Sequence, residues 1–419
     1  MKRRDFLRAS SVLAATSCFS MLDGSAFADS ADKSQNATRR GSYANSYRVF
    51  KETGRGRVAF LGGSITEMDG YRPMVCEYLK KRFPKTEFEF VAAGISSTCS
   101  DVGAFRLESD VLSGGKVDLF FVEFAVNDDQ DGGFDLTHAT RGMEGIIRHI
   151  RRSNPNVDIV MTFFVNENLM AQYRNGKEAT SIEAHRKVAE RYDISTINLA
   201  KEIQERIDSG DITWQEFGGV HPAPRGNRIC ADLIATILDR DYLNGAVAET
   251  KPHNLPAPID AFSYSNASWR GFDAIATNEG ATIADENALE RGAFRLYEPN
   301  WPQIRGSFRQ TFAGVPLLCG EKAGAELKFE FDGNALALFI LAGPDAGMID
   351  YRIDKGDWRR ANAFHHYSGG LHYPRALTLA DAVENGRQNV ELRLASDKDG
   401  RSSGTALRIL QIAVNRGEG

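Results

Sequence analysis

Cysteine is scarce in this chain: five of its 419 residues are cysteines. No two of them form a Cys-x-x-Cys pair, which excludes a zinc ribbon or a dithiol redox motif of that type. His-Glu-x-x-His is missing and no Gly-x-Gly-x-x-Gly follows a predicted strand, so we expect neither a metal nor another cofactor. Four cysteines lie beyond the N-terminal segment, and disulfides and buried free thiols both stay open for them: Cys76, Cys99, Cys230 and Cys319.

An excess of basic residues is also missing, because the formal net charge is −5 at pH 7. This mild acidity argues against nucleic acid and against an anionic membrane surface as partners. No stretch is both long and apolar enough to span a bilayer. Hydrophobic residues at 42% and charged residues at 26% are typical of a globular protein with a sizeable core.

The N-terminal segment, residues 1–28, has the features of an export signal. Lys2-Arg3-Arg4-Asp5-Phe6-Leu7-Arg8 resembles the twin-arginine motif, and a short apolar run follows it. Ala26-Phe27-Ala28 then offers a small-x-small cleavage site. We therefore expect twin-arginine export, cleavage near Ala28 and a periplasmic or secreted protein.

Two domains are predicted after this signal. Residues 29–54 are rich in Ser, Asn, Arg and Gly and predict a leader. Strands and helices alternate through residues 55–241, which predicts an α/β three-layer domain with a parallel sheet. Residues 242–310 contain several prolines and predict an irregular connector. In residues 311–419 short alternating runs predict an antiparallel β-sandwich.

The elements expected in the α/β domain follow from apolar runs and from helical spacing of apolar residues. The strands are predicted at 58–61, 88–92, 118–124, 157–164 and 196–199. The helices are predicted at 72–83, 101–112, around 143–150, 182–192 and 225–238.

Four residues stand where these predicted elements end. Ser64 follows the first strand across two glycines, Gly94 ends the second and Asn127 follows the third. His221 comes just before the last helix. Any one of them could be a turn or cap residue, but open α/β sheets place their chemistry at such strand ends. In this order and spacing the four residues resemble the SGNH (GDSL-type) hydrolase superfamily, over residues 56–240.

The resemblance implies acyl transfer by a serine esterase. Ser64 would attack an ester carbonyl, and His221 would take its proton and return it to the leaving alcohol. The backbone N–H groups of Ser64 and Gly94 and the side-chain amide of Asn127 would stabilise the oxyanion. Glycine suits that role because no Cβ keeps its backbone from the substrate.

Two positions depart from the superfamily pattern. The residue before the nucleophile is Gly63, where the superfamily usually has Asp. The triad acid normally lies three residues before the histidine, and that position is Gly218. Three explanations stay open: Glu216 orients His221, a backbone carbonyl does so in a Ser–His dyad, or the site has been put to another use. Asp211 is a more distant candidate for the acid.

Exported superfamily members with an appended sandwich resemble carbohydrate esterases. The expected function is therefore removal of acetyl or other small acyl groups from a polysaccharide or oligosaccharide. Two other classes stay open. One is a non-catalytic carbohydrate-binding protein, an alternative suggested by the missing acid at position 218. The other is a glycosidase, which needs two facing carboxylates from among Glu123, Asp128 and Glu216.

Several aromatic and histidine residues have two interpretations each. Residues 364–373 form either a loop of the sandwich that closes over the cleft or an exposed aromatic turn. The tryptophans are either sugar-stacking platforms or core residues: Trp269, Trp301 and Trp358. The histidines on predicted helices are expected at the surface or in packing: His138, His149 and His185. No feature of the sequence indicates an oligomeric state.

Overall fold

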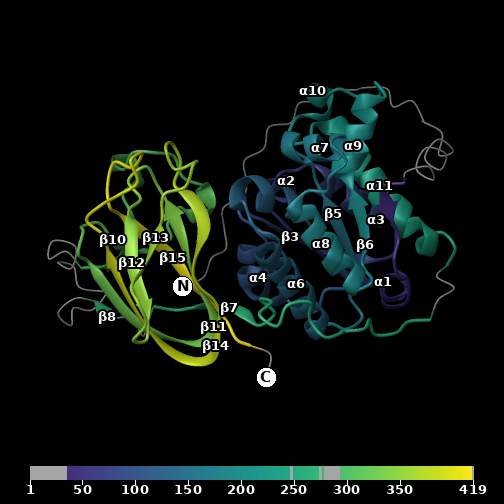
Figure 1. Ribbon diagram of the computed structural model, residues 1–419. Coiled ribbons are helices and arrows are strands. Elements are labelled where there is room, and N and C mark those ends of the chain that lie inside the picture. Colours follow the sequence, from purple (N-terminus) through teal and green to yellow (C-terminus); the bar gives the residue numbers. More distant parts are fainter. Residues whose placement is uncertain (1–34, 246–248, 273–275, 278–292, 418–419) are drawn as a thin grey trace, which may run out of the picture.

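The computed structural model of the chain has two domains that lie side by side (Figure 1). The residues that it describes are 35–245, 249–272, 276–277 and 293–417. The predicted export signal, residues 1–28, lies outside the described residues. No helix within the described ranges combines the length and the apolar character that a membrane crossing requires.

The N-terminal domain is built on a six-stranded sheet with strand order β1-β6-β5-β4-β2-β3. Its strands are β1 (Ala37–Thr38), β2 (Arg55–Gly62), β3 (Glu87–Gly94), β4 (Leu119–Val122), β5 (Asp158–Phe163) and β6 (Ser195–Asn198). All strand pairs are parallel except that of β1 with β6. Every residue of β4 and β5 is buried, which explains their apolar sequences. The predicted α/β fold is confirmed.

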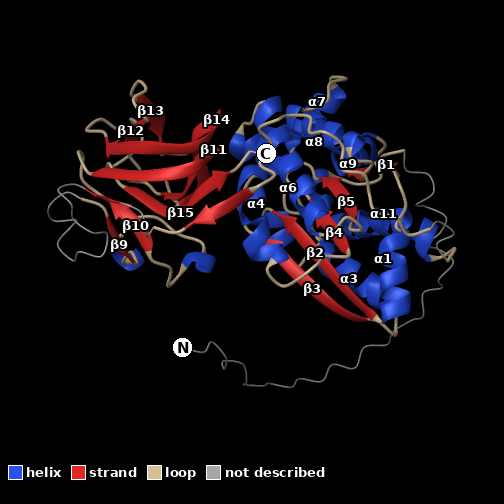
Figure 2. Ribbon diagram, turned by 90° about the horizontal axis from the view of Figure 1, so that it is seen from below, coloured by secondary structure: helices blue, strands red, loops and turns tan. Residues whose placement is uncertain are grey.

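Helices cover both faces of this sheet (Figure 2). Helices α4, α6 and α8 pack together, and α1, α3 and α11 form a second group. The helices of the domain include α1 (Ala44–Arg48), α2 (Ser64–Glu67), α3 (Tyr71–Arg82), α4 (Ser100–Leu107), α5 (Ala125–Asn127), α6 (Leu136–Ser153), α7 (Glu167–Arg174), α8 (Thr180–Arg191), α9 (Leu199–Asp208), α10 (Trp214–Phe217) and α11 (Pro224–Tyr242). The sheet order reverses between β2 and β4, so the crevice outside their carboxyl ends is where such folds bind ligands.

The predicted leader is folded from residue 35 onward and belongs to the α/β domain. Tyr43, Tyr47 and Phe50 lie on one side of α1 and of the π-helical turn that follows it, and all three are buried in the core of the domain. The backbone N–H of Tyr43 donates to Asp241 of α11 at 2.6 Å. The polar composition of residues 29–54 concealed this helical spacing of aromatic residues.

The C-terminal domain is an antiparallel β domain, as predicted, but its two layers belong to one curled nine-stranded sheet. The long strands β11 and β14 pair along most of their length and carry register shifts near Gly333 and Leu336, which bend them. The strands are β7 (Ala267–Arg270), β8 (Ala276–Thr277), β9 (Arg295–Tyr297), β10 (Leu317–Gly320), β11 (Glu326–Ala342), β12 (Met348–Ile353), β13 (Arg359–Asn362), β14 (Tyr373–Leu394) and β15 (Leu407–Asn415). Because β7, β8 and β9 pair with this sheet, the predicted connector contributes strands to it.

A charged cluster joins the two domains. His138 of α6 lies 3.3 Å from a carboxylate oxygen of Asp101 and 3.5 Å from one of Asp381, on β14. Arg141 of α6 reaches Asp381 at 2.9 Å. Burial alone would lower the pKa of His138, but the hydrogen bonds to the two carboxylates outweigh it and raise the pKa to about 10. His138 is therefore charged at neutral pH and acts in domain packing.

Replacing His138 by glutamine tests this cluster. The pKa of His138 is about 10 in the folded protein and 6.5 ordinarily. Its contribution to the free energy of unfolding is therefore complete below pH 6.5 and is lost as the pH rises through 10. The contribution should amount to about 1–3 kcal/mol at neutral pH. Urea unfolding across this pH range should show the free energy of unfolding falling more steeply in the wild type than in His138→Gln. Parallel pH curves for the two proteins would contradict the assignment.

Candidate active site

Ser64 is the first residue of α2, and Gly63 alone separates it from the end of β2. The two glycines before it are sterically required. A Cβ on Gly62 would lie 2.0 Å from Oε1 of Glu123, and one on Gly63 would lie 2.2 Å from Oδ1 of Asn127. The turn that presents the serine therefore fits closely on the end of β4 and the segment that follows it, and any larger residue would displace it.

Ser64 forms a hydrogen bond with His221. The distance from Oγ of Ser64 to Nε2 of His221 is 2.8 Å, although the two residues are 157 positions apart in the sequence. The histidine lies in the loop between α10 and α11 and is exposed. This is the contact that an activated nucleophile and its general base require.

The other two predicted residues lie at the same end of the sheet. Gly94 ends β3 opposite Gly62, and a Cβ there would lie 2.1 Å from the backbone nitrogen of Glu67 in α2. Asn127 ends α5, is 3% exposed, and has its amide oxygen 2.2 Å from where a Cβ on Gly63 would lie. Its Nδ2 donates to Asp131 at 2.6 Å, which leaves the second N–H of the amide for another acceptor.

Position 218 has no room for the usual triad acid. Gly218 caps α10 with a φ of +105°, and a Cβ on it would lie 2.1 Å from the backbone nitrogen of Ala223. An aspartate there would strain the backbone and displace the loop that carries His221. Within the described ranges, Nδ1 of His221 has no hydrogen-bond partner. The geometry is that of a Ser–His pair without a carboxylate.

Glu216 acts as a helix cap in this structure. Its Oε2 accepts hydrogen bonds from the backbone N–H of Thr213 at 2.8 Å and from the hydroxyl of the same residue at 2.9 Å. The backbone N–H bond is the main reason that the pKa of Glu216 is lowered. Its other oxygen faces Arg225, and Asp211 pairs with Arg206 at 2.8 Å. The hydrogen bonds of both candidate acids thus go to residues other than His221.

Glu123 lies beneath the nucleophile turn and is 1% exposed. Its Oε1 accepts from the backbone N–H of Gly63 at 2.9 Å and from the hydroxyl of Thr66 at 2.7 Å. Burial raises the pKa of Glu123 to about 7. This buried carboxyl group thus binds residues on both sides of Ser64.

Asp128 is fully buried as well. Its Oδ2 accepts from the hydroxyl of Ser100 at 2.7 Å and lies 2.9 Å from Nε2 of His185, which fixes α4 and α8 against the segment after β4. Of the three carboxylates considered for a glycosidase, Glu123 and Asp128 are thus buried and hydrogen-bonded within the domain, and Glu216 caps a helix.

Sequence reasoning missed Arg106, whose side chain lies under the site. One guanidinium nitrogen donates to the carbonyl of Ala93 at 2.7 Å and another to the carbonyl of Gly62 at 2.9 Å. The residue is 1% exposed, and burial lowers its pKa. Arg106 thus binds the carboxyl ends of β2 and β3 together. In the sequence, the feature that could have pointed to this role is a single arginine between Phe105 and Leu107, on a helix whose residues are all buried.

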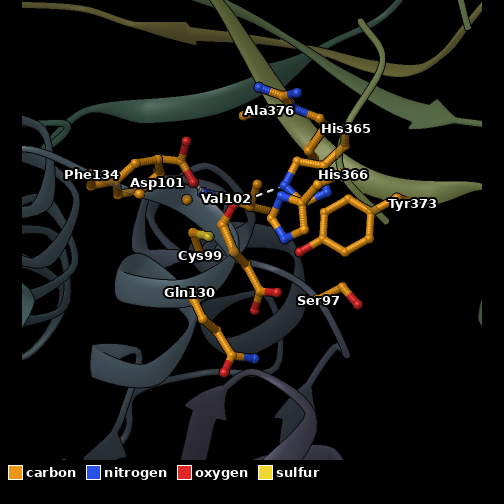
Figure 3. Close-up of a pocket in the computed structure, with 14 residues that line it drawn as sticks. Ser97, Cys99, Asp101, Val102, Gln130, Phe134, His365, His366, Tyr373 and Ala376 are labelled. Carbon is orange, nitrogen blue, oxygen red and sulfur yellow. Dashed lines mark hydrogen bonds between the residues drawn. The ribbon is translucent and has the colours of Figure 1, made fainter. Parts of the chain in front are cut away.

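A pocket of about 240 Å³ lies between the two domains (Figure 3). The lining residues come from the segments after β3 and β4 and from the C-terminal domain, and they include Ser97, Cys99, Gln130, Asp131, His365, His366, Tyr373 and Arg375. Nε2 of His365 lies 2.9 Å from the carbonyl oxygen of Asp131. Of the two interpretations of residues 364–373, the structure agrees with a loop that lies against the hydrolase-like domain.

The remaining candidate residues have plain structural positions. Trp301 and Trp269 stack on aromatic neighbours, with ring centroids 4.6 Å from Phe308 and 5.6 Å from Phe339. Trp358 is 40% exposed, and two arginine side chains lie over its ring. The four cysteines of the described chain are free and buried.

Substituting Gly218 tests the steric argument about the acid. Gly218→Asp should lower both the free energy of unfolding and the rate of ester hydrolysis, because the new Cβ clashes with Ala223. Gly219→Asp is the matched control: Gly219 also has a positive φ, of +74°, but nothing lies within 4 Å of its Cβ position. We expect Gly218→Asp to be less stable than this control by at least about 2 kcal/mol. A rise in kcat with Gly218→Asp would contradict the argument.

The buried Glu123 makes stability depend on pH. Its pKa rises from the ordinary 4.5 to about 7 on folding, so the folded protein binds the proton more tightly. The free energy of unfolding should therefore fall, by on the order of 2 kcal/mol, as the pH rises from 4.5 to 7. Urea titrations of the wild type and of Glu123→Gln measure this, and the variant should lack that component. Identical pH dependence in both proteins would refute it.

The chain is similar to known proteins in its fold and, over part of its length, in its sequence. The two-domain fold is similar to the crystal structure of a two-domain esterase active on acetylated mannans, with a TM-score of 0.71, 20% identity, and coverage of 92% of this chain and 98% of that one. A structure of such an esterase crystallised with mannopentaose gives a TM-score of 0.66 at 21% identity, with the same coverage. No curated protein matches the chain. Residues 60–229, within the α/β domain, match the GDSL-like Lipase/Acylhydrolase family.

Proposed function

We propose that this chain is a serine esterase that removes acetyl groups from a polysaccharide. The observation that carries the proposal is the 2.8 Å contact between Oγ of Ser64 and Nε2 of His221 at the switch point of the sheet. A free serine hydroxyl is a weak nucleophile, and a neighbouring imidazole is the usual means of activating it. The match of residues 60–229 to a family of ester hydrolases supports the same chemistry.

The reaction would proceed through an acyl-enzyme. Oγ of Ser64 attacks the ester carbonyl carbon while Nε2 of His221 takes the hydroxyl proton. The second amide N–H of Asn127 and the backbone N–H groups of Ser64 and Gly94 stabilise the oxyanion of the tetrahedral intermediate. Nε2–H of His221 then protonates the leaving alcohol, and water attacks the acetyl-serine with the same base.

A carbohydrate substrate is proposed from the second domain and its pocket. Solved structures with the same two-domain arrangement include esterases active on acetylated mannans, one of them crystallised with mannopentaose. The pocket between the domains combines aromatic rings, which suit the C–H faces of sugars, with polar groups that suit hydroxyls. Acetylated mannan is therefore the first substrate to test. Since such polymers lie outside the cell, we also propose that the N-terminal segment directs export.

A non-catalytic carbohydrate-binding protein is the second candidate. The unpartnered Nδ1 of His221 favours it, because a missing triad acid costs about 10⁴ in kcat in a serine protease. The hydrogen bond to Ser64 is retained, however, and it would serve no purpose in a protein that only binds. Acetate release distinguishes the two candidates.

Ser64→Ala and His221→Ala should each lower acetate release from acetylated mannan by at least about 10³-fold, because each removes a partner of the proton transfer. Acetate is measured enzymatically with purified protein, and glycan binding is measured in parallel by calorimetry. Ser209→Ala, at the exposed end of α9, serves as the control and should keep wild-type activity. A wild type that binds the glycan and releases no acetate from any acetylated polysaccharide would establish the second candidate instead.

A further inference from the structure

The side-chain amide of Asn127 has one orientation that its surroundings allow. Its oxygen lies 2.2 Å from the position that a Cβ on Gly63 would take, and its nitrogen donates to Oδ2 of Asp131 at 2.6 Å. A carboxylate oxygen only accepts, so the amide nitrogen, not the oxygen, must face Asp131. The orientation of the N–H that remains for an oxyanion is therefore set by the carboxylate of Asp131.

Asp131 is itself held by the C-terminal domain. The carbonyl oxygen of Asp131 accepts a hydrogen bond from Nε2 of His365 at 2.9 Å. Burial lowers the pKa of His365 to about 4, so the ring is neutral. Its Nδ1 accepts from the backbone N–H of Tyr367 at 3.3 Å, which leaves the proton on Nε2, where the contact with Asp131 needs it.

Hydrogen bonds and a ring contact hold the loop that carries His365. Its backbone N–H donates to the hydroxyl of Ser368 at 2.9 Å, and that hydroxyl donates to the carbonyl of Ala342 in β11 at 2.7 Å. The ring of Tyr373 stacks on His365 with centroids 4.1 Å apart, and its hydroxyl points into the pocket (Figure 3). Burial raises the pKa of Tyr373, and the nearby carboxylate of Asp131 adds to this effect.

These contacts form a continuous path from the second domain to the oxyanion site. Residues 365 and 131 are 234 positions apart and lie in different domains, whereas Asp131 and Asn127 are one helical turn apart. An isolated α/β domain would keep the bond between Asn127 and Asp131 and would lose the group that fixes Asp131. The path ends at the side-chain amide of Asn127, which is proposed to donate to the ester carbonyl. A change along the path should therefore affect the rate of acyl transfer.

We propose that Asp131, fixed by His365 of the C-terminal domain, is a positioning residue for the oxyanion-binding amide of Asn127, so that the second domain supports acyl transfer itself as well as substrate binding. This inference rests on the proposed esterase function. It separates two roles for the pocket, because a pure sugar subsite would affect only glycan substrates.

The test compares two esters in the full-length protein. One is 4-nitrophenyl acetate, whose alcohol has no sugar to contact the second domain, and the other is an acetylated manno-oligosaccharide. Asp131→Ala should lower kcat on the small ester by about 10–100-fold with KM changed less than about threefold, since complete loss of an oxyanion donor costs about 10²–10³. His365→Ala should lower the same kcat by about 3–10-fold.

Matched variants separate positioning from folding. Asp131→Asn should recover most of the activity, because the amide oxygen can accept the same hydrogen bond from Asn127. Asp129→Ala removes a carboxylate of the same turn that bonds to Asn166 and Asn168, and it should keep wild-type kcat. His149→Ala, on α6 beside Glu108, is the control for His365→Ala. Thermal unfolding midpoints identify any variant whose loss of activity comes from misfolding.

The outcomes are distinct. If Asp131→Ala and His365→Ala keep kcat on 4-nitrophenyl acetate within twofold and raise only KM for the glycan, the pocket is a sugar subsite and the inference is overturned. An equal loss with Asp131→Asn and Asp131→Ala would also overturn it. A wild type inactive on both esters would overturn the proposed function, and this inference with it.

Discussion

The steric fit around the turn before Ser64 is the constraint on which the site depends. Two glycines bring the backbone of β2 so close to its neighbours that a Cβ would meet Glu123 at 2.0 Å or Asn127 at 2.2 Å. The same closeness lets Glu123 bind the N–H of Gly63 and lets Asn127 lie beside the nucleophile. Arg106 adds a second support by bridging the ends of β2 and β3. The positions of Ser64 and Asn127 are thus set by packing of the backbone.

Much of this could be predicted because it depends on local sequence. Apolar runs gave the parallel strands, and the position of Ser64, Gly94, Asn127 and His221 at element ends gave their meeting place, since parallel strands end at one edge of a sheet. The sequence also showed that a glycine replaces the usual triad acid at position 218. It did not show that an acid cannot fit there, because the positive φ of Gly218 and its closeness to Ala223 are properties of the folded loop.

The parts that could not be predicted depend on contacts between distant residues. Nothing in the sequence relates His365 to Asp131, or Asp381 to His138, because each pair comes from different domains. The curl of the C-terminal sheet depends on bulges in β11 and β14 that leave the alternating pattern almost unchanged. Both interdomain contacts involve a histidine and a carboxylate residue. His138 is charged because two carboxylates face its ring, whereas His365 is neutral because burial lowers its pKa.

The central claim is that Ser64 and His221 form a working nucleophile and base without a triad acid. Labelling with a fluorophosphonate, followed by intact-mass and peptide mass spectrometry, tests it most directly, since the reagent reacts with activated serines and needs no knowledge of the glycan. The account predicts one phosphonyl group per chain, on Ser64, and loss of labelling in His221→Ala. An unlabelled wild type, or labelling of Ser64 that does not depend on His221, would contradict it.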